Sequence, residues 1–247
     1  MHSIVCYAQN EKKKSRLVLE AFAAGCGGRM ASANVERLEP GDVAFYGVRP
    51  PWSHLWRQAQ IERRTIYYAD NSFFDDTRET KFRVGRNVVQ MHEFPKRSYP
   101  AFDRPIMPWR EGGEHIVVCP QSNEFMVCVE RFTEQWTDWV CRRLRMYTTR
   151  PLVIRTKRDR RPLADDLKGA WALVTHTSAA ANEAIIAGIP AFTTGLCAAS
   201  SMSNHDLAQI EHPRCPDGRA AWAAAVSAHQ WTLEEMRDGT CWKALHA

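Results

Sequence analysis

The sequence predicts an α/β fold with doubly wound parallel sheets, and three observations support this fold class. Short apolar runs alternate with amphipathic stretches along most of the chain, as in parallel sheets whose strands are joined by helices. The 247 residues suffice for one large domain or for two small domains packed together. Apolar residues make up 45% and charged residues 25% of the chain, the composition of an ordinary globular protein.

The first half of the chain contains three predicted strands and two predicted helices. The strands are the runs "SIVCYA", "VAFYGV" and "TIYYAD", at residues 3–8, 43–48 and 65–70. The helix at 13–28 ends on glycine and the helix at 51–63 opens with proline, as helix ends commonly do. Residues 71–113 are rich in aromatic residues, arginine and proline, which predicts irregular structure and a linker that ends near Gly113.

The second half alternates more regularly. Its predicted strands are 115–121, 151–157, 171–177 and 190–195, and its predicted helices are 132–147, 163–169 and 178–188. We therefore predict two α/β lobes, residues 1–113 and 114–247, with the helices after Pro216 returning toward the first lobe.

Polar and cationic side chains follow the predicted strands of the second lobe. Ligands of doubly wound sheets bind outside the carboxyl ends of the strands, so these residues are candidates for a binding site. They are Gln121, Ser122, Arg155, Lys157, residues 175–178 and residues 193–195.

The stretch 175–178 stands where a strand passes into a helix, whose first turn has unsatisfied backbone N–H groups and a positive dipole end. Thr177 or Ser178 can cap this helix, and in a complex the hydroxyl and N–H groups can bind a diphosphate. Glu183 lies far enough along the helix to reach a ribose hydroxyl. Ser and Thr also serve as purely structural caps, but one cap does not require four consecutive polar residues.

The run "VTHTSAAANEAIIAGIPAF" resembles the nucleotide-sugar-binding helix of B-type glycosyltransferases, which pair two Rossmann-like domains around a ligand cleft. The similarity is closest to the capsular-polysaccharide branch and to small phage-encoded transferases of hydroxymethylated DNA bases. It covers residues 115–245 and includes "VIRTKRDRRPLADDL" and the tail from Ser203. In the first half, "IYYADNSFF" and "KFRVGRN" resemble the phage proteins more loosely.

The resemblance implies a glycosyltransferase that uses a nucleotide sugar, a UDP-sugar in particular, and needs no metal. Residues 1–113 would hold the acceptor and residues 114–247 the donor. The implied donor contacts are Gln121 and Ser122 near the base or ribose, Arg155 and Lys157 on the diphosphate, His176, Thr177 and Ser178 at the helix N-terminus, and Glu183 on ribose. Many members carry a paired acidic motif across this helix, whereas here Asn182 precedes Glu183.

Three kinds of function fit these features. The first is glycosylation of a hydroxymethylpyrimidine in double-stranded phage DNA, and the second is capsule or lipopolysaccharide synthesis. The third is a nucleic-acid-binding protein without catalysis, favoured by arginine clusters such as "CRRLR" and by the net charge of +5. The N-terminus lacks the features of a signal peptide, which predicts a cytoplasmic protein, in the host cytoplasm if a phage encodes it. No apolar run approaches the ~20 residues that cross a bilayer.

Transfer to a hydroxyl requires a group that takes the acceptor proton. Asp70 ends a predicted strand and is the first candidate, with Asp75 as the second; an Asp-Asn pair after a strand is also a common turn. Arg83 and Arg86 could bind acceptor phosphates or simply coat the surface. Trp52 and Trp109 are the tryptophans placed to stack on a base or a sugar. The eight cysteines include no C-x-x-C pair, so we expect free thiols and no metal site.

Overall fold

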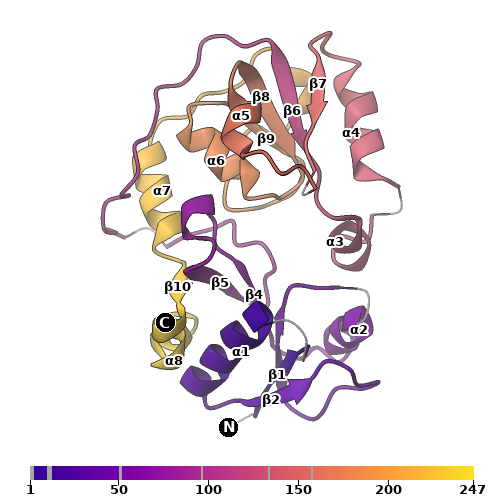
Figure 1. Cartoon of the computed structure of the whole chain (residues 1–247), viewed down its shortest axis with the longest axis vertical. Helices are drawn as coiled ribbons and strands as arrows, with labels where there is room; N and C mark the ends of the chain where they lie inside the picture. The colour runs from indigo at the N-terminus through magenta and orange to yellow at the C-terminus, as the bar shows by residue number, and fades with distance from the viewer. Residues whose placement is uncertain (1–2, 10–12, 50–51, 96, 133, 157) are drawn as a thin grey trace. The chain divides into compact units, whose positions relative to one another are not determined.

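The computed structural model describes residues 3–9, 13–49, 52–95, 97–132, 134–156 and 158–247. The chain divides into two compact α/β units, and Figure 1 labels most of their helices and strands. Unit 1 comprises residues 1–89 and 229–247, and unit 2 comprises residues 90–228. Each unit has its own sheet of mainly parallel strands, which confirms the predicted fold class.

The two units divide the chain at other positions than the predicted lobes 1–113 and 114–247. Residues 90–113 belong to unit 2, where their backbone forms hydrogen bonds with the second half of the chain. The N–H of Met107, for example, donates to the carbonyl oxygen of Ile186 at 2.9 Å. The stretch that the sequence suggested as a linker is therefore part of the packed surface of unit 2.

The last residues of the chain belong to unit 1. This segment contains β10 (Trp231–Thr232), α8 (Leu233–Arg237) and α9 (Thr240–Ala244), whereas α7 (Arg219–Ser227) remains in unit 2. The side chains of Thr232 and Glu235 form a capping box that starts α8. Of the helices expected to return to the first lobe, α8 and α9 do so and α7 does not.

Unit 1 has a six-stranded sheet in the order β10-β5-β4-β3-β1-β2. Its other strands are β1 (Ile4–Ala8), β2 (Arg29–Ser32), β3 (Asp42–Tyr46), β4 (Ile66–Asn71) and β5 (Lys81–Arg86). The first four strands in the chain pair in parallel, and β5 pairs antiparallel with β4 and β10. Strand β5 corrects the expectation of irregular structure at 71–113. Charged and apolar residues alternate from Lys81 to Val84, which is the two-residue period of a strand, and Arg83 is buried together with Phe82 and Val84.

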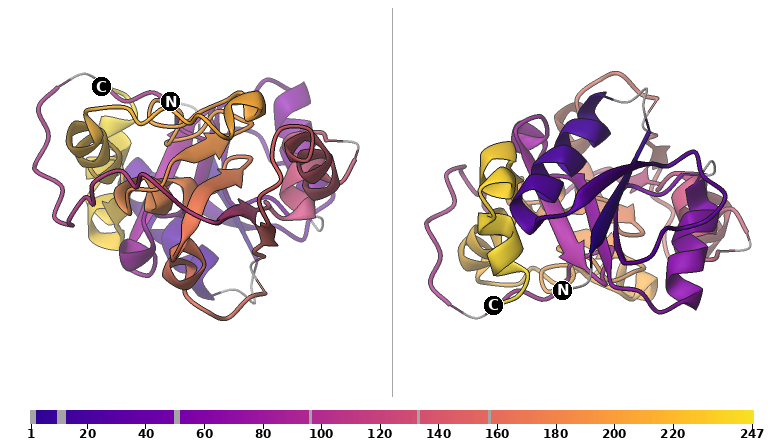
Figure 2. Two further views of the ribbon diagram at one scale, coloured as in Figure 1. Left: turned by 90° about the horizontal axis from the view of Figure 1, so that it is seen from above. Right: turned by 90° about the horizontal axis from the view of Figure 1, so that it is seen from below.

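The two faces of this sheet carry different helices. Residues of even number in β1, such as Cys6, pack with Phe22 of α1 (Lys13–Cys26) and with Met236 of α8. Helices α1 and α8 lie side by side, as the right view of Figure 2 shows. On the opposite face, Trp56 of α2 (Ser53–Ile61) contacts the ring of Phe45 edge-on at 6.0 Å. The aromatic rings of alternate residues therefore fill two cores, one on each side of the sheet.

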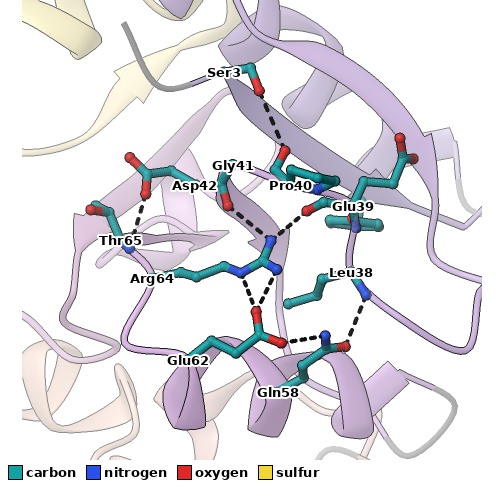
Figure 3. Close-up of polar contacts among 11 residues, drawn as sticks. Ser3, Leu38, Glu39, Pro40, Gly41, Asp42, Gln58, Glu62, Arg64 and Thr65 are labelled. Atoms are coloured by element: carbon teal, nitrogen blue, oxygen red, sulfur yellow. Dashed lines mark hydrogen bonds and ion pairs between the residues drawn. The ribbon is translucent and has the colours of Figure 1, made fainter.

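A polar network centred on Arg64 holds the amino ends of β3 and β4 (Figure 3). The Arg64 guanidinium donates to the carbonyl oxygens of Glu39 and Gly41 and to the carboxylate of Glu62. Gln58 adds a bond to Glu62 at 2.6 Å and accepts the N–H of Leu38 at 2.9 Å. One arginine thus satisfies backbone groups of the loop before β3.

Unit 2 has a four-stranded, wholly parallel sheet in the order β7-β6-β8-β9. The strands are β6 (His115–Cys119), β7 (Leu152–Ile154), β8 (Ala170–Thr175) and β9 (Ala191–Thr193). The helices are α3 (Asn123–Cys128), α4 (Trp136–Leu144), α5 (Leu163–Leu167) and α6 (Ala180–Ile186), besides α7. Among the described residues, short 3-10 helices span Asp75–Thr77 in unit 1 and Leu207–Gln209 in unit 2. The chain moves from β6 to β7 on one side and then to β8 on the other, so the strand order reverses between β6 and β8.

Gly188 ends the segment that contains α6. Its φ of +77° is a conformation that favours glycine, and a Cβ atom there would lie 2.0 Å from the carbonyl oxygen of Pro108. The N–H of Arg110 donates to the Gly188 carbonyl oxygen at 2.7 Å. The glycine therefore both terminates the helix and lets residues 107–110 approach it closely.

Candidate functional site

The candidate site lies at the carboxyl edge of the unit 2 sheet. Because β6 and β8 are neighbours in parallel, with Cys119 paired to Thr175, the residues after both strands emerge together. The side-chain N–H of Gln121 donates to the hydroxyl of Thr177 at 2.8 Å. This bond spans the point where the strand order reverses, the position at which doubly wound sheets bind ligands. The structure thus brings together two predicted site residues that are 56 positions apart in the chain.

Ser122 and Ser178 both serve local backbone groups at this edge. The Ser122 hydroxyl caps α3 by accepting the N–H of Phe125 at 3.3 Å. The Ser178 hydroxyl accepts the N–H of Ala180, the first residue of α6, at 3.3 Å. Its role therefore matches the predicted cap only in part, since the residue at the N-cap position is Ala179, which has no side-chain cap. Both hydroxyls are half-buried and lie where a ligand could compete for them.

His176 is buried between α4 and the edge of the sheet, with 5% of its surface exposed. Its Nδ1 lies 2.8 Å from the hydroxyl of Thr194, which also accepts the indole N–H of Trp136 at 2.9 Å. This arrangement favours a Thr194 hydroxyl that donates to Nδ1, with the imidazole proton on Nε2. His176 Nε2 lies 3.4 Å from a carboxylate oxygen of Glu130 in a geometry that is not a hydrogen bond. A proton on both nitrogens would convert this contact into an ion pair.

Glu183 and Arg155 each have an internal partner that the sequence did not reveal. Glu183 forms a two-bond ion pair with Arg104, at 3.1 and 2.9 Å. Arg155 donates to the carboxylate of Asp166 at 2.6 Å, and that carboxylate also accepts the Nε of Arg161 at 2.7 Å. A ribose or phosphate would have to share these side chains with their partners. Lys157 lies outside the described residues.

Burial raises the pKa of Asp166, but the hydrogen bonds from Arg161 and Arg155 outweigh burial and hold the pKa below its ordinary value. The carboxylate is thus ionised and fixes the loop that follows β7. Asp166 stands at helix α5, and nothing in its spacing from Arg155 predicts the pair. Glu130, Arg104 and Asp166 are the polar partners that sequence reasoning missed.

The predicted base and acceptor residues lie in unit 1. Asp70 and Arg83 face each other across β4 and β5, and the Arg83 guanidinium donates to the carboxylate at 3.0 Å. The hydroxyl of Tyr68 also points to this carboxylate, at 3.3 Å. Arg86 occupies the exposed end of β5, opposite Tyr67. Asp70 and Arg83 therefore form one cross-strand pair, and Arg86 is separate from it.

Three further properties of the described residues bear on the site. They contain no group of three or more His, Cys, Asp or Glu side chains arranged to hold a metal ion. Within the same residues, no helix combines the length and apolarity that a membrane span needs. All eight cysteines are free thiols, and five of them are buried.

Comparisons with known proteins identify the fold. No protein-family model matches the sequence, and no curated protein does. Two similar solved structures come from Thermosulfurimonas dismutans KpsC. Its "beta Kdo 2,4 transferase" is 11% identical, with 91% of this chain and 90% of that chain covered at a TM-score of 0.51. Its "beta Kdo 2,7 transferase" is 10% identical, with 98% and 99% covered at a TM-score of 0.53. At these identities the likeness is one of fold.

Proposed function

We propose that the protein is a glycosyltransferase that moves a sugar from a nucleotide-sugar donor to a hydroxyl group. The observation that carries the proposal is the fold shared with two Kdo transferases over 91% and 98% of this chain. The polar carboxyl edge of the unit 2 sheet supports it, because such an edge is where doubly wound sheets bind nucleotides.

The donor would bind at this edge. Gln121 and Ser122 face the base or ribose in the proposed complex, and Ser178 with the first backbone N–H groups of α6 meets the phosphates. Arg155 lies beside them after β7 and neutralises part of the phosphate charge while Asp166 keeps it oriented. Glu183, held by Arg104, accepts a ribose hydroxyl. Lys157 completes the proposed diphosphate contacts.

In the proposed reaction the acceptor oxygen forms a bond to the anomeric carbon and the bond from that carbon to the phosphate oxygen breaks. The nucleotide leaves with the negative charge, which the cation and N–H groups of the donor site stabilise. We propose Asp70 as the base that takes the acceptor proton, with Arg83 fixing its carboxylate. No metal enters this scheme, so activity should persist in EDTA.

We propose that the acceptor is a saccharide. Both KpsC structures are named as Kdo transferases, which supports the capsule or lipopolysaccharide branch over transfer to hydroxymethylpyrimidines in DNA. A purely nucleic-acid-binding role has less support. Its arginine clusters are partly neutralised within unit 2, where Arg142 pairs with Glu134 and Arg161 pairs with Asp166.

The decisive experiment offers the protein a panel of nucleotide sugars with two kinds of acceptor. One arm contains Kdo-bearing and neutral oligosaccharides, and the other contains plain and hydroxymethylated double-stranded DNA, with products identified by mass spectrometry. We expect a sugar adduct in the saccharide arm. An adduct on hydroxymethylated DNA alone would reassign the acceptor, and no adduct in any arm together with no nucleotide binding would reject the transferase.

Nucleotide affinity tests the donor site independently of the acceptor. Calorimetry with nucleoside mono- and diphosphates should give weaker binding for Arg155→Gln, because a charge-assisted contact contributes about 1.5–3 kcal/mol, roughly ten- to a hundredfold in affinity. Arg142→Gln is the matched control, since Arg142 is also paired with a carboxylate but projects from α4. Equal affinity in both variants would remove Arg155 from the site.

A further inference from the structure

A second candidate binding site lies in unit 1, at the carboxyl ends of β1, β3 and β4. A pocket of ≈ 560 Å³ opens there, and its size falls within the range of small-molecule sites. Its described lining residues are Tyr7, Ala8, Gln9, Lys14, Ser15, Tyr46, Arg49, Trp52, Asn71, Arg78 and Glu79. The strand order of this sheet reverses between β1 and β3, so the pocket occupies the position that doubly wound sheets use for ligands.

The charges of this unit 1 pocket favour an anion. Its lining contains three cationic side chains and one carboxylate, that of Glu79. Glu79 is already paired with Lys14, whose Nζ lies 3.0 Å from the carboxylate and 2.8 Å from the carbonyl oxygen of Arg78. Arg49 and Arg78 therefore make the electrostatic potential in the pocket positive. Guanidinium groups bind both carboxylates and phosphates.

Helix α1 adds to this positive potential. Its first turn includes Lys14 and Ser15 and has no acidic residue. A lysine at the positive end of a helix of 14 residues is unfavourable for the helix itself, because the dipole favours negative charge there. An anion bound in the pocket would offset both the lysine and the dipole.

Aromatic and amide groups complete the pocket. Trp52 and Tyr7 are among its lining residues, and 4% or less of either residue is exposed. Burial raises the pKa of Tyr46, which keeps its hydroxyl protonated, and that hydroxyl donates to the side-chain oxygen of Asn71 at 2.8 Å. With this oxygen occupied, the Asn71 amide offers its NH₂ group as a donor. A ring with hydroxyl or anionic oxygens matches these groups.

We propose that the pocket binds a small anionic molecule built on a ring, whose carboxylate or phosphate contacts Arg49 and Arg78 while the ring packs against Trp52. Every residue in this proposal belongs to unit 1. The proposal concerns binding by unit 1 and does not rest on the transfer reaction or on the donor site of unit 2.

Calorimetry on the full chain at low salt tests this proposal with glucose 6-phosphate, glucuronate and neutral glucose. We expect at least one of the two anions to bind with a Kd below 10 mM and at least tenfold more tightly than glucose. Preference for glucose 6-phosphate identifies a phosphate ligand, and preference for glucuronate identifies a carboxylate ligand. Equal binding of glucose and the anions, or no binding of either anion up to 10 mM, would overturn the proposal.

Variants locate the binding in this pocket. Arg49→Gln and Arg78→Gln should each weaken the anion at least tenfold, whereas Arg57→Gln, an exposed arginine of α2 outside the lining, should leave the affinity unchanged. Trp52→Phe should weaken the ring-bearing anions while leaving inorganic phosphate unaffected. Urea unfolding checks that each variant is folded. Anion binding that survives both pocket-arginine substitutions would place the ligand elsewhere and refute the assignment.

Discussion

Replacing Asp166 by asparagine tests whether its carboxylate holds the loop after β7. Its side chain is 4% exposed and accepts bonds from Arg155 at 2.6 Å and from Arg161 at 2.7 Å. Asparagine keeps the shape but loses the charge. The Arg155 side chain is only 16% exposed, so water cannot fully replace the hydrogen bond that it loses in this variant. A hydrogen bond to a charged group contributes about 1.5–3 kcal/mol. We expect Asp166→Asn to lower the free energy of unfolding by about 2 kcal/mol.

The assay is urea unfolding at pH 7, followed by tryptophan fluorescence and circular dichroism. Asp165→Asn is the matched control, because the neighbouring carboxylate is 44% exposed and its ion-pair partner is Lys168. We expect no measurable change in that control. If Asp166→Asn changes the stability by less than about 0.5 kcal/mol, the ion pair does not stabilise the loop and the reasoning is refuted.

Three further predictions concern pH, catalysis and packing. Since the pKa of Asp166 is held below its ordinary value, its stabilisation is complete above about pH 4 and is lost at lower pH, so wild type and Asp166→Asn should converge in acid unfolding experiments. Asp70→Asn should reduce turnover about a hundredfold while nucleotide affinity stays constant, and full activity would exclude Asp70 as the base. In Gly25→Ala a Cβ would lie 1.9 Å from the Met236 carbonyl oxygen, and this overlap should cost about 1–3 kcal/mol. Alanine also stabilises a helix by roughly 1 kcal/mol relative to glycine, and we expect the overlap to outweigh this gain, so that the variant is less stable than wild type. Gly112→Ala has open space and should match wild type in the same thermal unfolding measurement; equal stability of both variants would contradict the packing.

The strands and the edge that carries the candidate site could be predicted from the sequence. The strands follow from hydrophobic periodicity, and the edge follows from the rule that ligands bind at the carboxyl ends of parallel strands. Buried strands such as β1 and β8 are continuous apolar runs, and their ends carry the polar residues that meet at the edge. The Gln121 to Thr177 bond follows from strand adjacency, although the two residues are far apart in the chain. Strand β5 was not predicted because it contains three cationic residues and stands in a stretch rich in aromatic residues, arginine and proline, which is typical of irregular structure; the pairing with β4 shows that it is a strand.

The partners of charged side chains could not be predicted from spacing. Arg104 and Glu183 are 79 positions apart, and only the packing of residues 90–113 on unit 2 brings them together. The unit 1 pocket is a similar case. Lys14, Arg49 and Arg78 follow different strands or begin a helix, and each alone is typical of a solvated surface. Their convergence depends on the strand order, which the sequence pattern does not specify.

The location of residues 229–247 in unit 1 has a consequence for synthesis. Unit 2 is one continuous stretch, so all of it is synthesised before β10 and α8, and domains generally fold as units during synthesis. Unit 1 must wait for its last strand and helices, which join it across a loop that contains the whole of unit 2. Throughout that interval the Phe22 face of α1 and the outer edge of β5 lack their native cover. The nascent N-terminal part is therefore the segment that chaperones are expected to protect.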